Sequence, residues 1–123
     1  MARIDFENHF AATEWLAALR RDATQAPAGA LSLFGPGSPM AARLTDLGEG
    51  RLAAMDEAGI DVAVLSLSGP GIEQFEPRAA TKIAKEANDE LAAAISRYPD
   101  RFRGFAALSA RDTDAAVVEF ERC

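Results

Sequence analysis

A strand, a long helix and a second strand follow one another between residues 60 and 108, and this succession most constrains the fold. The first strand, "IDVAVLSLS" at 60–68, is apolar on both faces, as is typical of a strand buried in a parallel sheet. Pro77 suits the first turn of the helix that follows, and Pro99 ends that helix. The second strand is "FRGFAAL" at 102–108. We therefore expect the two strands to pair in parallel through a right-handed helical crossover.

Four further segments extend this α/β pattern. The alternation of residues 3–10 predicts a strand, and Thr13 suits the cap of a short helix behind it. The stretch "RLAAMDEAG" at 51–59 predicts a helix that stops at Gly59. The final "DTDAAVVEFERC" predicts a helix with Asp112 as its cap. An α/β protein with about three strands follows, either as an open doubly wound sheet or as part of a (β/α)₈ barrel.

The segment at about 22–44 interrupts this pattern. It holds three of the six prolines and three of the nine glycines in the chain. Too little chain precedes it to fold alone, so it does not mark a domain boundary. The sequence predicts a loop excursion within one domain, and long loops in compact proteins are often functional.

The length of the chain limits how complete such a fold can be. A (β/α)₈ barrel needs about 250 residues, with about 200 as a practical minimum, whereas this chain has 123. The last predicted helix also reaches Cys123 without a stop signal. We expect residues 1–123 to be a partial barrel domain, the N-terminal fragment of a larger protein. The alternative is a small three-stranded domain with a frayed C-terminal helix.

The composition excludes several kinds of partner. The formal net charge is −6 and the lysines and arginines do not cluster, which argues against a nucleic-acid surface. No apolar run approaches the roughly 20 residues of a membrane span, and the N-terminus lacks the apolar core of a signal peptide. The single cysteine, Cys123, cannot form an internal disulfide. We expect a cytoplasmic protein with neither nucleic acid nor membrane as a partner.

The first strand contains the only histidine, in "DFENHF". Residues i and i+2 of a strand project from one face, about 7 Å apart, so Glu7 and His9 should lie side by side. A carboxylate and an imidazole suit zinc or manganese, but a catalytic zinc site usually takes three protein ligands. Asp5 shares the same alternation, so the alternative is an ordinary amphipathic edge strand with Phe6 and Phe10 buried.

Several stretches together resemble one protein family. The E-x-H triplet, "RLAAMDEAGIDVAVLSLSGPG", "IAKEANDELAAAISRYPDRFRGFAAL" and "DTDAAVVEFERC" are similar to the amidohydrolase-type metal-dependent decarboxylases. These include γ-resorcylate, 2,3-dihydroxybenzoate and 5-carboxyvanillate decarboxylases. The resemblance covers nearly the whole chain and is weakest at 22–44. It implies a (β/α)₈ barrel with one divalent metal, zinc or manganese, at its C-terminal face, and no organic cofactor.

The resemblance also implies which residues would bind the metal. Glu7 and His9 match the family's first-strand ligands, while a histidine and an aspartate on later strands would lie beyond Cys123. That aspartate is the expected proton donor, so no catalytic residue is expected within this chain. Asn8 stands where the family often has an acidic residue, and it should point away from the metal.

The implied reaction is the non-oxidative decarboxylation of an ortho-hydroxybenzoate-type aromatic acid. A small aromatic carboxylic acid is then the substrate, and the full-length protein is expected to be a homodimer or homotetramer, as family members commonly are. Ser68, Gly69 and Pro70 follow the second strand on the rim that holds Glu7 and His9. They are candidates for substrate binding, although they also suit a tight turn into the next helix.

Two other functions remain open at the level of sequence. The amidohydrolase scaffold also supports metal-dependent hydrolysis, in which a metal-bound water attacks an amide, ester or lactone. A truncated domain with exposed sheet edges is the other alternative, and such a domain would catalyse nothing.

Overall fold

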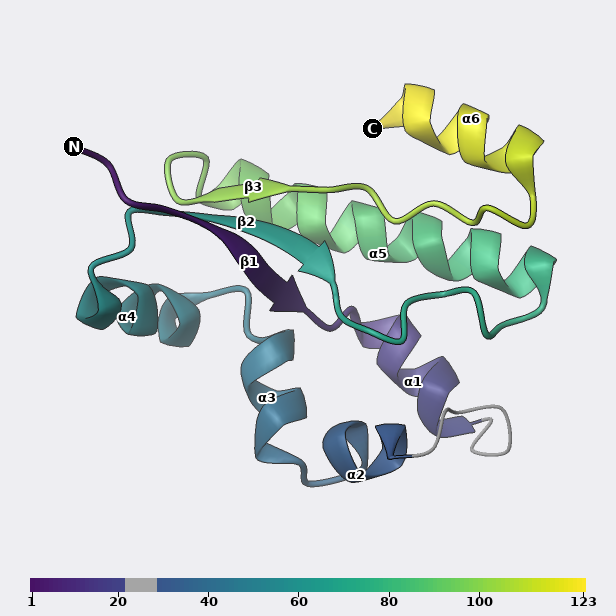
Figure 1. Ribbon diagram of the computed structural model, residues 1–123, viewed down its shortest axis with the longest axis horizontal. Helices are drawn as coiled ribbons and strands as arrows, with labels where there is room; N and C mark the ends of the chain where they lie inside the picture. The colour runs from purple at the N-terminus through teal and green to yellow at the C-terminus, as the bar shows by residue number, and fades with distance from the viewer. Residues whose placement is uncertain (22–28) are drawn as a thin grey trace.

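The computed structural model describes residues 1–21 and 29–123 and shows an α/β structure built on one three-stranded sheet (Figure 1). The strands are β1 (Ile4–Phe10), β2 (Val62–Leu67) and β3 (Phe102–Gly104). The helices are α1 (Thr13–Arg21), α2 (Ala30–Phe34), α3 (Pro39–Thr45), α4 (Glu49–Ala58), α5 (Pro77–Arg97) and α6 (Thr113–Arg122).

The sheet has the order β1-β2-β3, and both strand pairs are parallel. Parallel neighbours require a crossover, and α5 provides the one between β2 and β3. The α/β class, the three strands and their parallel pairing are confirmed. Pro77 is the first residue of α5, as predicted, and Gly59 ends α4 with a left-handed φ of 68°.

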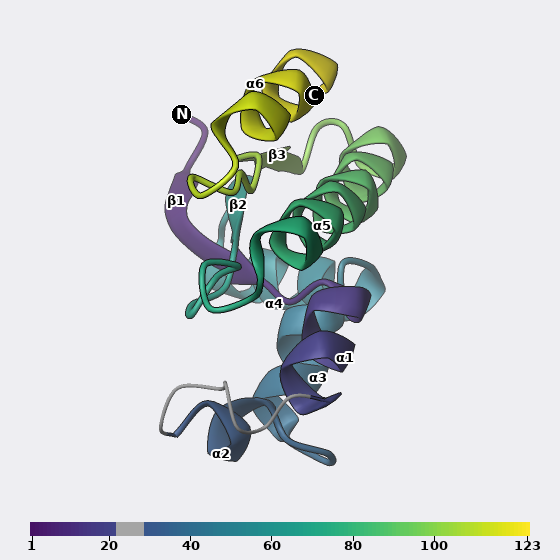
Figure 2. The ribbon, with the colours of Figure 1, turned by 90° about the vertical axis from the view of Figure 1, so that its right-hand side faces the viewer.

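In the described part of the chain, helices cover only one face of the sheet (Figure 2). We call this the covered face, and its side chains are at most 1 % exposed: Phe10, Ala63, Leu65 and Phe102. They pack in one apolar cluster with residues of α1 and α5, including Trp15 and Leu19. Burial of apolar area on this scale is the main stabilising term available to so small a domain.

The opposite face of the sheet, called the open face, exposes large apolar side chains. The exposed fractions are 48 % for Ile4, 67 % for Phe6 and 58 % for Phe105. Val64 in the central strand is the exception at 7 %. The sheet is therefore half-covered among the described residues, as expected for strands that would line the inside of a barrel.

A bulge in β1 changes the faces that simple alternation predicts. Asp5 pairs with Ala63 and Asn8 pairs with Leu65, so residues 6–7 of β1 oppose a single residue of β2. One extra residue moves every following side chain to the other face. Asp5 consequently shares the covered face with Asn8 and Phe10, not the face of His9.

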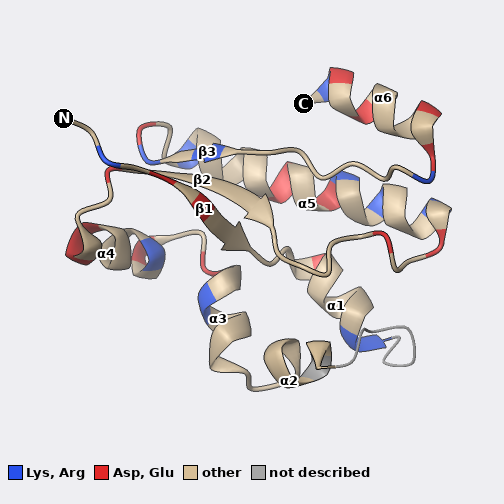
Figure 3. Cartoon of the chain, in the orientation of Figure 1, with Lys and Arg blue, Asp and Glu red and all other residues tan. Residues whose placement is uncertain are grey.

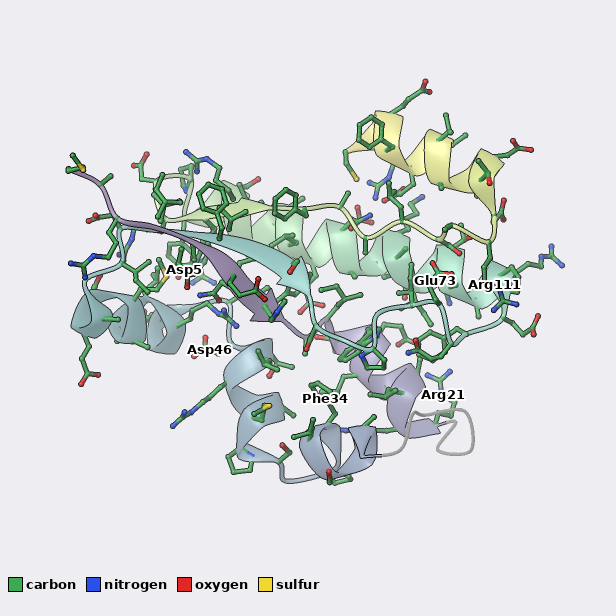
Figure 4. The ribbon with its side chains drawn as sticks, viewed as in Figure 1. Asp5, Arg21, Phe34, Asp46, Glu73 and Arg111 are labelled. Atoms are coloured by element: carbon green, nitrogen blue, oxygen red, sulfur yellow. The ribbon has the colours of Figure 1, made fainter. Side chains whose placement is uncertain are left out.

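Two predictions about β1 are therefore wrong. Asp5 does not lie beside Glu7 and His9; it accepts a hydrogen bond from Asn8 Nδ2 at 2.8 Å (Figure 4). Phe6 is not buried but is mostly exposed on the open face. Phe10 is buried, as predicted.

The segment predicted as a loop excursion contains two short helices, α2 and α3, in its described part, while 22–28 lie outside the described residues. Ser38 caps α3, because its hydroxyl accepts a hydrogen bond from the Ala41 N–H at 3.2 Å. Phe34 is 3 % exposed and packs edge-on against Trp15, with 5.2 Å between ring centroids (Figure 4). The segment thus adds to the core.

Strand β3 is shorter than predicted and ends at Gly104. Phe105 N still donates to Leu65 O of β2 at 2.9 Å, and farther along the Asn88 amide of α5 donates to Ala107 O at 3.0 Å and accepts from Ala107 N at 2.7 Å. A side chain takes both backbone groups that a neighbouring strand would otherwise pair with.

Charge is dispersed over the fold. Acidic and basic residues are interspersed along α5, and the lysines and arginines do not gather into one patch (Figure 3). Within the described ranges, none of the helices combines the length and apolar character needed to cross a membrane.

Candidate metal centre

Glu7 and His9 lie together near the carboxyl end of β1. His9 Nε2 is 3.0 Å from Glu7 Oε1, and His9 Nδ1 is 2.9 Å from Ser66 Oγ. The side chain of Glu7 is 89 % exposed and that of His9 is 42 % exposed. The ring is therefore held from two sides, by Glu7 of its own strand and by Ser66, which pairs with His9 from β2.

The local backbone brings this pair together. Glu7 is one of the two residues in the bulge of β1, and its N–H donates to Asp5 Oδ1 at 3.1 Å. The carboxyl ends of parallel strands meet at one edge of the sheet, which is where barrel enzymes hold their reacting groups. The structure therefore brings together the two residues that the sequence singled out.

Asn8 points to the opposite side and anchors β1 to α4. Arg51 of α4 donates to Asn8 Oδ1 at 2.6 Å and to Asp46 O at 2.7 Å. Burial lowers the pKa of Arg51 from its ordinary value, and the nearby Asp46 carboxylate opposes that shift. As expected, Asn8 faces away from the Glu7–His9 pair.

A groove of about 710 Å³ opens beside the pair, between β1 and helices α3 and α4. Glu7, Asn8 and His9 line it on one side, and Arg43 and Arg51 contribute guanidinium groups. Asp46 and Glu57 also line the groove, so carboxylates as well as guanidinium groups lie beside the two possible metal ligands.

The donor set fits one part of a divalent-metal site. An exposed carboxylate and a partly exposed imidazole are ligand types that suit zinc or manganese. In the part of the chain that the structure describes, His, Cys, Asp and Glu form no group of three that could hold a metal ion. Glu7 and His9 thus fit as two ligands of a set that needs others.

The candidate substrate-binding residues form a tight turn after β2. Ser68 is 7 % exposed, its N–H donates to Phe10 O at 2.8 Å, and the Gly69–Pro70 peptide is cis. Trp15 Nε1 donates to Gly71 O at 2.5 Å and holds the turn. The turn lies next to the end of β1, but the Ser68 hydroxyl contacts Gly69 O at 3.4 Å rather than the groove.

Sequence reasoning missed a polar cluster between α5 and α6. Buried Asn88 donates to Glu119 Oε1 at 2.9 Å, and Arg122 pairs with both Glu119 and Asp89 at 2.6 Å. The hydrogen bond from Arg122 is the main cause that lowers the pKa of Glu119 from 4.5 to about 2. The alternation of charged residues along two helices gave no signal that these side chains would meet.

The loops after β2 and β3 are also fastened to each other. Glu73 Oε1 accepts from Ala110 N at 3.0 Å, and Arg111 donates to Phe75 O at 3.0 Å (Figure 4). These contacts hold together the two loops at the carboxyl ends of β2 and β3.

The parallel strands and their helical crossover are those of a partial α/β barrel, and sequence comparison identifies the family. The profile of the amidohydrolase family matches residues 4–123, so the chain belongs to the amidohydrolase family. The chain is 42 % identical over 125 residues to γ-resorcylate decarboxylase of Rhodococcus jostii (strain RHA1), covering 98 % of this chain and 34 % of that protein. It spans about a third of the length of the curated relatives it matches.

Solved structures give the same relationship. The 5-carboxyvanillate decarboxylase of Novosphingobium aromaticivorans, complexed with manganese and 4-hydroxy-3-methoxy-5-nitrobenzoic acid, matches with a TM-score of 0.86 at 36 % identity. That match covers 98 % of this chain and 38 % of the other. The dihydroxybenzoic acid decarboxylase of Polaromonas sp. JS666, with bound manganese and the inhibitor 2-nitroresorcinol, matches with a TM-score of 0.77 at 36 % identity. That match covers 99 % of this chain and 34 % of the other. The chain is thus related to metal-dependent aromatic acid decarboxylases.

Proposed function

We propose that the protein to which this chain belongs is a carboxy-lyase that removes CO₂, without oxidation, from an ortho-hydroxybenzoate-type aromatic acid. The observation that supports it most is the Glu7–His9 pair at the carboxyl end of β1. It stands in a chain that aligns over 98 % of its length with decarboxylases. We infer further that residues 1–123 form one partial (β/α)₈ domain of a longer polypeptide, since the relatives are about three times as long.

In this proposal Glu7 and His9 hold one divalent metal, zinc or manganese, and no organic cofactor takes part. A bound metal supplies a Lewis acid for the carboxylate and ortho-hydroxyl of the substrate. Glu7 contributes negative charge and His9 a neutral nitrogen, while the Asn8–Arg51 hydrogen bond fixes the backbone that carries them. Fixed ligands matter because a displacement of about 1 Å can lower a rate about 100-fold.

The substrate would be a small aromatic carboxylic acid bound near the groove beside β1. Arg43 and Arg51 line that groove and are our candidates to pair with the substrate carboxylate, beside the Asp46 and Glu57 carboxylates that also line it. Ser68, Gly69 and Pro70 remain our candidates to border the substrate, with Gly69 exposed at the turn. We propose a homodimer or homotetramer for the full-length protein, by analogy with the family.

The test is an assay of the polypeptide encoded by the complete reading frame, loaded with manganese or zinc. Carboxyl-¹³C-labelled 2,6- and 2,3-dihydroxybenzoate are supplied, and labelled CO₂ is measured. Glu7→Gln and His9→Asn should each lower the rate more than about 100-fold, since loss of a ligand exceeds the 10–100-fold typical of outer-shell partners. Glu121→Gln, an exposed carboxylate on α6, is the matched control and should leave the rate unchanged.

Two results would contradict the proposal. Undiminished CO₂ release by both Glu7→Gln and His9→Asn would remove the metal role of the pair. Hydrolysis of amides or lactones without any CO₂ release from hydroxybenzoates would favour the hydrolase alternative instead.

A further inference from the structure

Both ring nitrogens of His9 already have a partner. Nδ1 lies 2.9 Å from Ser66 Oγ and Nε2 lies 3.0 Å from Glu7 Oε1. A neutral imidazole has one N–H and one lone pair, so one partner must accept a hydrogen bond and the other must donate one. The identity of the two partners decides which nitrogen carries the proton.

Without a metal, the Glu7 carboxylate determines which ring nitrogen of His9 carries the proton. An ionised carboxylate only accepts hydrogen bonds, so Nε2 carries the proton and donates to Glu7 Oε1. The Ser66 hydroxyl then donates to the lone pair on Nδ1. In this tautomer neither nitrogen is free to bind a metal.

A metal shared by Glu7 and His9 requires the opposite tautomer. Nε2 is the nitrogen that faces Glu7, so it must present its lone pair, and the proton must sit on Nδ1. The Ser66 oxygen can accept that Nδ1–H bond because its own hydrogen has another acceptor, Asn8 O at 3.5 Å. One rotation of the hydroxyl therefore satisfies either form of the ring.

We propose that Ser66 is a positioning residue that lets His9 exchange tautomers, and that its hydroxyl accepts the Nδ1–H bond when Nε2 binds metal. This inference rests on the proposed metal centre at Glu7 and His9. The exchange moves one proton from Nε2 to Nδ1 through water, with no net gain or loss by the ring. Ser66 is half-buried in the central strand, directly opposite His9 in the register, so its oxygen stays in reach.

The experiment uses the polypeptide encoded by the complete reading frame, because Glu7 and His9 are only two ligands of a set that needs others. Its histidines are labelled with ¹⁵N, and the two ring-nitrogen signals of His9 are identified by their loss in His9→Asn and followed by NMR. Metal-free protein should show the Nε2–H tautomer of His9, and added Zn²⁺ should convert it to the Nδ1–H tautomer.

Three variants test whether Ser66 acts through its hydrogen bond to His9 or only through its contribution to the fold. Ser66→Ala should raise the zinc dissociation constant reported by His9 about 10–100-fold, the range typical of an outer-shell partner. Ser66→Thr keeps a hydroxyl and should restore the affinity to within about threefold of the original chain. Ser109→Ala removes a buried hydroxyl in the loop after β3 that has no hydrogen-bond partner among the described residues, and it should change neither the His9 tautomer nor the zinc affinity.

The possible outcomes separate failure of the role proposed for Ser66 from failure of the metal centre proposed at Glu7 and His9. If the His9 signals of the unaltered chain ignore zinc, the metal centre at Glu7 and His9 fails, and the role of Ser66 fails with it. If they respond but Ser66→Ala binds zinc equally well with Nδ1 protonated, only the inference about Ser66 is overturned. Zinc bound through Nδ1 in the unaltered chain would also overturn it, whether or not Ser66→Ala folds.

Discussion

The two faces of the sheet differ in how deeply their side chains are buried and in the polar contacts that they carry. The covered face buries Phe10, Leu65 and Phe102 to at most 1 % exposure, whereas the open face leaves Phe6 and Phe105 more than half exposed. The open face also carries the polar contacts of His9 with its two neighbours.

This contrast separates stability from chemistry. Apolar side chains on the covered face contribute most of the free energy of folding, because they lose contact with water when helices pack on them. Side chains on the open face keep contact with solvent, so they contribute little to folding and are free to bind other groups. Function and stability can therefore be altered separately in this chain.

Two phenylalanines test the contrast with the largest expected effect. Phe102→Ala should destabilise the chain by about 3–5 kcal/mol, since it leaves a cavity among fully buried residues. Phe105→Ala, three residues along and on the open face, should change the free energy of unfolding by about 0.5 kcal/mol or less. Urea unfolding followed by the fluorescence of the only tryptophan, Trp15, measures both.

If Phe102→Ala does not fold, Phe102→Leu provides a milder version, with an expected loss of about 1–1.5 kcal/mol. Equal losses for Phe102→Ala and Phe105→Ala would show that both faces are covered in solution and would remove the distinction.

Gly104 sharpens the contrast on the covered face. A Cβ at this position would enter the Leu91 side chain and approach Ile95 Cδ1 to 3.2 Å. Gly104→Ala should therefore destabilise the chain by about 1–3 kcal/mol through overpacking. The neighbouring Arg103 faces the other way, and Arg103→Ala should change the unfolding free energy by about 0.5 kcal/mol or less in the same urea titration.

The contact of α6 with α5 extends the comparison to a polar interface. Glu119→Gln should destabilise the chain by about 1 kcal/mol at neutral pH, because the partly exposed Arg122 is screened by water. Glu121→Gln on the same helix serves as the control, with no expected change.

The pH dependence of this effect follows from the lowered pKa of Glu119. Its folded value of about 2 lies below the ordinary 4.5, so the stabilisation is present above pH 4.5 and is lost as the pH falls towards 2. Thermal melts of the two chains should differ at neutral pH and converge near pH 2. A difference that stays constant over this range would contradict the role assigned to the Glu119 carboxylate.

The smallest effect is expected for the candidate metal ligands themselves. Glu7→Gln and His9→Asn should each change the free energy of unfolding by about 0.5 kcal/mol or less, because both side chains are well exposed. Urea titration without metal measures this. A loss above about 2 kcal/mol would mean that the pair supports the fold, and reduced metal binding by these variants would then have a structural explanation.

Local signals in the sequence predicted most helix boundaries correctly. Pro77 begins α5, Gly59 ends α4, and the Asp112 side chain caps α6 by accepting from Ala115 N at 3.2 Å. Each of these depends on the geometry of a few consecutive residues, which is why the sequence suffices. The buried apolar character of β2 likewise indicated a parallel sheet.

Features that depend on contacts between distant segments could not be predicted in this way. Apolar residues within a proline- and glycine-rich segment concealed the helices α2 and α3, and Phe34 takes its core position only because Trp15 lies beside it. The hydrogen bonds of Ala107 likewise depend on Asn88, nineteen residues away.

By itself, the sequence determined the order of the three strands and of helices α1, α4, α5 and α6, and the spacing of Glu7 and His9, because these follow from local backbone geometry. Only the tertiary structure decided which side chains share a face of β1, since the bulge exists only in the pairing of β1 with β2. The same pairing placed Ser66 against His9 across 57 residues of sequence. No local pattern can specify that contact, because the register between two strands is set by how both pack against the helices.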